Sequence, residues 1–79
     1  DYEAQTMLWF DRVLTQTTPN GRPYTVTERR AVATALESFS GVDGVYELKT
    51  KARGLVEAEI KAATTAEQRE SLRTLRNML

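Results

Sequence analysis

Residues 25–39 read TVTERRAVATALESF, and this stretch indicates the fold class more directly than any other part of the chain. Thr25 and Glu28 have the spacing of a capping box, in which each side chain accepts a hydrogen bond from the other residue's backbone N–H. An apolar stripe with helical spacing follows the box: Val32, Ala35, Leu36 and Phe39. Gly41 then ends the pattern, because glycine readily adopts the left-handed conformation that closes many helices. We therefore predict an amphipathic helix over about residues 26–39.

The segment before this helix is expected to contain one helix and one loop. Residues 2–16 carry apolar side chains at helical spacing on one wide face: Ala4, Met7, Leu8, Phe10 and Leu14. Residues 17–23 read TTPNGRP, which favours a type I turn and disfavours helix immediately before Pro23. A β-hairpin around Asn20-Gly21 is the alternative, but the flanking segments alternate poorly between polar and apolar residues.

The third predicted helix is the longest of the four. It begins between Val42 and Val45, where Ser40 or Asp43 can supply the N-cap oxygen. Its apolar stripe predicts one buried face: Val45, Leu48, Ala52, Leu55, Val56 and Ala63. Glu59 continues this stripe, so either its carboxylate points toward the core and needs a cationic partner, or the helix emerges into solvent there.

The fourth predicted helix follows two overlapping capping boxes, Thr64 with Glu67 and Thr65 with Gln68. Leucines at core spacing then mark its buried face: Leu72, Leu75 and Leu79. Four helices with short connections predict an all-α fold, either a small four-helix bundle or two packed antiparallel helical hairpins.

The composition and motifs exclude several classes of site. The chain contains no cysteine, so disulfides and thiolate zinc sites are excluded, and no histidine, the commonest general acid–base residue and metal ligand. It contains no glycine-rich phosphate loop, and Asp43-Gly44 is only a fragment of a calcium loop. We therefore expect a protein that is not an enzyme and binds no metal or cofactor.

Charge and hydropathy indicate the environment. Eleven basic residues balance eleven acidic ones, so no long-range field attracts nucleic acid or an anionic membrane. No stretch approaches the roughly 20 apolar residues that cross a bilayer, and we expect a soluble, cytoplasmic protein without a membrane partner. Residue 1 is Asp and a helical pattern begins almost at once, so residues 1–79 are expected to form a single helical domain of a longer protein.

The candidate partner-binding residues are Tyr2, Trp9 and Val13. They align on a side of the first helix that differs from its main apolar face. Either this helix is buried on all sides, or it presents an aromatic patch, since Trp and Tyr dominate interface hot spots. In the second case Trp9 is exposed in the isolated domain and covered by another protein or a second copy. The predicted function is a non-enzymatic protein-interaction or assembly module.

Three arginines at helical spacing fall on one side of the fourth helix: Arg69, Arg73 and Arg76. Such a stripe can bind phosphates or an acidic partner, but it is also typical of a solvated face paired with glutamates. Nucleic-acid binding is the alternative function, with further cations from the second and third helices: Arg29, Arg30, Lys49 and Lys51. A helix-turn-helix around Gly41 fits poorly, because Glu37 occupies a position that requires a small residue. We expect no tight nucleic-acid binding, because few clustered cations release few counterions.

Overall fold

The computed structural model describes residues 2–79, and four α-helices account for most of them. The elements in chain order are α1 (Tyr2–Thr15), α2 (Val26–Leu36), the 3₁₀ turn η1 (Glu37–Phe39), α3 (Val45–Ala62) and α4 (Ala66–Met78). No strand is present in this part of the chain. The all-α prediction is confirmed, and the predicted second helix corresponds to α2 together with η1.

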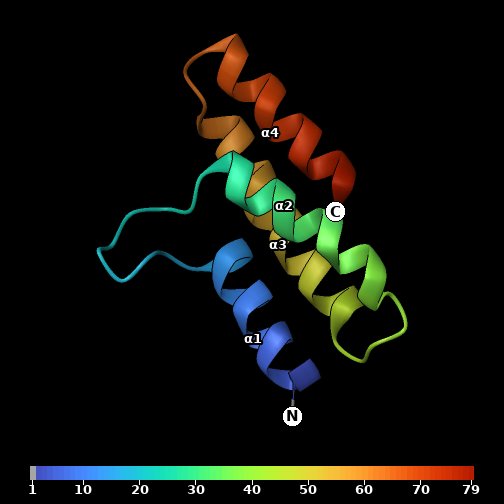
Figure 1. Ribbon diagram of the computed structural model, residues 1–79. Helices are drawn as coiled ribbons and strands as arrows, with labels where there is room; N and C mark the ends of the chain where they lie inside the picture. Colours follow the sequence, from blue (N-terminus) through green and yellow to red (C-terminus); the bar gives the residue numbers. More distant parts are fainter. Residues whose placement is uncertain (1) are drawn as a thin grey trace.

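The four helices surround one core. α1 and α4 each pack against both α2 and α3, whereas α2 and α3 face each other across the core with little direct backbone contact. Figure 1 shows α2 in front of α3, with α1 and α4 on opposite sides of this pair. The arrangement is the small four-helix bundle that the sequence predicts.

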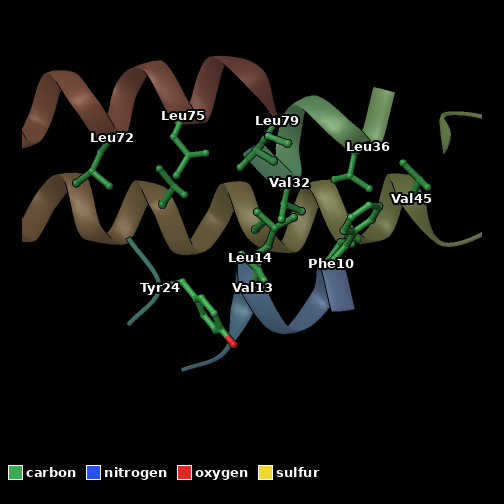
Figure 2. Close-up of a cluster of buried hydrophobic side chains, with 14 residues drawn as sticks. Phe10, Val13, Leu14, Tyr24, Val32, Leu36, Val45, Leu72, Leu75 and Leu79 are labelled. Atoms are coloured by element: carbon green, nitrogen blue, oxygen red, sulfur yellow. The ribbon is translucent and has the colours of Figure 1, made fainter. Parts of the chain in front are cut away.

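The core contains buried apolar side chains from all four helices and Tyr24 from the loop before α2. Figure 2 shows Leu72 and Leu75 of α4 pointing toward α3, and three side chains of α1 approaching from the other side: Phe10, Val13 and Leu14. Leu79, which directly follows α4, is buried in the same core. The predicted stripes of α3 and α4 are buried, except that Leu55 is exposed and Ala63 is half-buried. In α2, Ala33 is fully buried although the sequence did not assign it to the stripe.

The buried face of α1 differs from the predicted one. Phe10 and Leu14 are buried as expected, but Ala4 and Leu8 are exposed. Val13 is buried instead, because it lies three residues after Phe10 and next to Leu14, so the three side chains form a continuous stripe. α1 packs mainly against α2 and α3, with Phe10 also edge-on to Phe39 of η1, and this narrow stripe is the part that these neighbours cover.

The capping box at the start of α2 forms as predicted. The Glu28 backbone N–H donates to Thr25 Oγ1 at 3.1 Å, and the Thr25 N–H donates to Glu28 Oε1 at 2.9 Å. The Thr25 backbone hydrogen bond, followed by the one from its side chain, lowers the pKa of Glu28 because both favour the charged carboxylate.

The caps of α3 and α4 depart from the predictions. Thr65 caps α4 by accepting from the Gln68 N–H at 3.1 Å, but the Gln68 side chain accepts from the Thr64 N–H rather than that of Thr65. α3 begins after Gly44, which has φ 92° and no side-chain cap, so the prediction of Ser40 or Asp43 was wrong. Gly41 was also expected to be left-handed, but the glycines with positive φ are Gly21 and Gly44. The left-handed residue of this connection therefore stands at the entry to α3 and not at the exit of η1.

The loop between α1 and α2 contains the predicted turn. The Gly21 N–H donates to the Thr18 carbonyl at 2.8 Å, and the Thr18 N–H donates to the Arg22 carbonyl at 2.8 Å. Gly21 has φ 84°, which a residue with a side chain rarely adopts. The hairpin alternative is reduced to one isolated bridge between Thr17 and Pro23.

Leu75→Ala is expected to destabilise the bundle by about 2–5 kcal/mol, because it removes a fully buried side chain and leaves a cavity. Urea unfolding followed by circular dichroism measures this change. Leu55→Ala makes the same chemical change at an exposed position and is the matched control, for which a much smaller loss is expected. Equal losses in the two variants would contradict the packing described above.

The capping box also predicts a pH dependence. Glu28 has a lowered pKa in the folded state, so its contribution to stability is present at neutral pH and is lost as pH falls through that lowered pKa. Glu28→Gln keeps a side-chain acceptor but cannot titrate. The difference in unfolding free energy between the wild type and this variant should therefore shrink in acid, and a difference independent of pH would contradict the prediction.

Candidate interaction surface

Three large apolar side chains lie exposed on α1. Tyr2 is 80% exposed, Leu8 is 72% exposed and Trp9 is 51% exposed. We call these three residues the α1 outer face. Their exposure excludes the alternative in which α1 is buried on all sides.

Trp9 is held in place although half of its surface is in solvent. Its ring meets Tyr24 edge-on, with centroids 6.4 Å apart and an interplanar angle of 81°. Tyr24 is itself buried in the core beside the first residues of α2. The indole is therefore anchored on one side by a rigid neighbour and open on the other, which is favourable for a binding residue because little side-chain freedom is left to lose.

The structure corrects the predicted patch at one position. Tyr2 and Trp9 are exposed as expected, but Val13 is only 3% exposed and belongs to the core. Leu8 takes its place on the surface, although the sequence assigned Leu8 to the buried face. The spacing of Phe10, Val13 and Leu14 was the signal that could have identified the true core stripe.

A hollow adjoins the α1 outer face on the side of α1 nearest the connection between η1 and α3. The connection contributes Gly41, Val42 and Asp43, and α1 contributes Glu3, Ala4, Met7 and Leu8. Met7 and Val42 are partly buried against the core, so the floor of this hollow is apolar. Leu8 belongs both to the hollow and to the outer face.

The three arginines of α4 do not form a free cationic stripe. Arg73 donates to Glu70 at 2.9 Å, and Arg69 donates to the Ala63 carbonyl at 3.2 Å. Arg69 and Arg76 are each partly buried. The pairing of Arg73 with Glu70 is the local contact expected of a solvated helix face whose arginines pair with glutamates.

Glu59 has the cationic partner that its position in the stripe requires. Arg29 binds it with both terminal nitrogens, Nη1 at 2.5 Å from Oε2 and Nη2 at 3.1 Å from Oε1. Arg29 is 8% exposed and the Glu59 side chain is 39% exposed, so the pair lies at the edge of the core. Arg29 was proposed as one of the cations available to nucleic acid, and its burial and pairing remove it from that set.

This ion pair predicts an asymmetry between its two partners. Glu59→Leu should cost about 3 kcal/mol or more, because it leaves a buried guanidinium without a counter-charge. Arg29→Met should cost clearly less, because the Glu59 carboxylate is partly exposed and can be hydrated, and Met fills the space of the Arg stem. Urea unfolding of both variants and of the double variant Arg29→Met/Glu59→Leu tests this. A larger loss for Arg29→Met than for Glu59→Leu would show that the burial has been assigned to the wrong partner.

Other kinds of site find no support in the part of the chain that the structure describes. Within residues 2–79 no group of three or more His, Cys, Asp or Glu side chains is placed to hold a metal ion. No described helix combines the length and the apolar composition needed to cross a membrane. Comparisons with protein-family models, curated proteins and solved structures found no match.

Proposed function

We propose that this domain is a non-enzymatic protein-interaction module and that it binds its partner through the α1 outer face. The observation that carries the proposal is the exposure of Tyr2, Leu8 and Trp9 together on one short helix. Single exposed apolar residues are common on protein surfaces, whereas α1 exposes three large ones within about two turns, and a concentration of this kind is typical of interaction surfaces. The other large exposed apolar side chains, Tyr46 and Leu55, lie far apart on α3.

The residue types on this face support binding rather than accidental exposure. Trp and Tyr are enriched among the residues that dominate interface energetics, and Arg12, also exposed on the same helix, is of the third enriched type. Trp9 is also held by Tyr24 before any partner arrives, so binding does not have to order it.

Nucleic-acid binding receives less support than protein binding. Arg29 is buried against Glu59, and Arg73 already binds Glu70. The remaining exposed cations, among them Arg30 and Lys51, belong to different helices, and the net charge of the chain is zero.

Site-specific photo-crosslinking tests the proposal in cells that naturally produce the protein. A photoreactive residue is placed at Gln5, which is exposed on α1, and at Thr74 on α4 as the control position. We expect a discrete adduct from position 5 and none from position 74. Trp9→Ala should remove the adduct, since loss of a hot-spot side chain weakens binding by about 2 kcal/mol or more.

Circular dichroism and urea unfolding of Trp9→Ala provide the necessary check on folding. Because Trp9 is half exposed, the variant should remain folded with a modest loss of stability. A loss of about 3–5 kcal/mol would instead identify Trp9 as a core aromatic and would count against the proposal. Equal adducts from positions 5 and 74, or none from position 5, would overturn it.

A further inference from the structure

The outer side of α1 carries a projection and a recess on opposite flanks. Successive residues of an α-helix are about 100° apart, so Met7 and Trp9 lie on opposite flanks of Leu8. The flank of Trp9 also carries Tyr2, about two turns away, and we call these two exposed aromatic side chains the ridge. The flank of Met7 opens into the apolar hollow that Val42 helps to line. One side of one helix thus contains both halves of a self-complementary surface.

We infer that the partner of the α1 outer face is a second copy of this chain, with the two α1 helices side by side and parallel. The inference rests on the proposed function and names its partner. A two-fold axis running along the helices places the ridge of each copy over the hollow of the other, and the two Leu8 side chains meet near the axis. An antiparallel pair would oppose ridge to ridge and leave both hollows empty, which favours the parallel arrangement.

The charges that follow Leu8 fit the same arrangement. Asp11 and Arg12 lie one turn further along α1, Asp11 on the flank of the hollow and Arg12 on the flank of the ridge. In the parallel pair, Arg12 of each copy therefore lies beside Asp11 of the other. Within one chain, Asp11 Oδ1 is 3.7 Å from Lys51 Nζ, and Asp11 Oδ2 accepts from the Gln16 side-chain amide at 3.1 Å. The ion pair is loose and its Asp11 side chain is 33% exposed, so a cation from another copy can approach the carboxylate at its open side, beside these two contacts.

The size of the surface determines how strong this association can be. A helix of 14 residues is about 21 Å long, and stable complexes bury roughly 800 Å² on each partner. One face of α1 with its adjoining hollow is at or below this size. We therefore expect a dimer that forms and dissociates with concentration, not one that is required for folding.

Sedimentation velocity of the purified domain up to about 1 mM tests the inference, because a weak dimer is populated at such concentrations. The wild-type average mass should rise toward that of a dimer. Arg12→Asp and Asp11→Arg should each weaken self-association at least tenfold, because like charges then face each other across the axis. An equimolar mixture of these two variants should associate again, because aspartates on one chain then face arginines on the other.

Control variants separate the contact between copies from effects within one chain. Lys51→Ala removes the intrachain cation beside Asp11, keeps the Gln16 hydrogen bond to the carboxylate, and should leave association unchanged. Arg30→Asp makes the same charge change on the exposed side of α2 and should also have no effect. Circular dichroism of every variant confirms that the helices are retained.

The outcomes distinguish this inference from the proposed function. A wild type that stays monomeric, together with an adduct from position 5 to a different protein, would overturn the second-copy inference and leave the proposed function standing. Self-association that the mixture fails to restore, or that Leu8→Glu leaves unchanged, would overturn the parallel α1 arrangement. Association that weakens in both single variants and returns in the mixture supports it.

Discussion

None of the four helices can be stable alone, and all of them therefore depend on one shared core. α1, α2 and α4 contain 14, 11 and 13 residues, and isolated helices of this length are marginal in water even with favourable sequences. α3 has 18 residues, and it too gains most of its stability from packing of its amphipathic face. The core is small, because each helix contributes only a narrow stripe of apolar side chains. The largest fully buried side chains, Leu36, Val56 and Leu75, come from three different helices. Apolar side chains outside these stripes have no place in the interior, which is why Leu8 remains in solvent.

The Arg29–Glu59 pair shows how charged residues are accommodated in so small a core. α2 and α3 face each other without close backbone contact, and the long Arg29 side chain bridges the space between them. A buried pair of this kind often adds little net stability, but it penalises any arrangement of the two helices that would separate the charges. We interpret it as a contact that fixes the position of α2 relative to α3, in addition to the apolar packing.

Local signals made the four helices predictable, whereas features set by tertiary contacts, such as the buried face of α1 and the entry to α3, were not. The Thr25–Glu28 box and the leucines of α4 act within one or two turns, so the sequence alone identifies them. The spacing of Phe10, Val13 and Leu14 is one of two overlapping apolar stripes on α1, and the neighbours that α1 meets decide which stripe, and so whether Val13 or Leu8, is buried. The same holds for Arg29: it was expected to be a free cation, because the partner that buries it, Glu59, lies thirty residues away.

α1 and α4 occupy similar positions in the bundle, but only α1 exposes large apolar side chains on its outward side. Both helices pack against α2 and α3, so each has one side turned away from the core. The outward side of α4 is polar, with Glu70 and Arg73 paired on it, whereas that of α1 carries Leu8 and Trp9. Because the net charge is zero, no overall repulsion keeps two copies apart. An exposed apolar face on a domain of zero net charge favours association, and the charges of Asp11 and Arg12 beside that face favour one orientation of the two copies over the others.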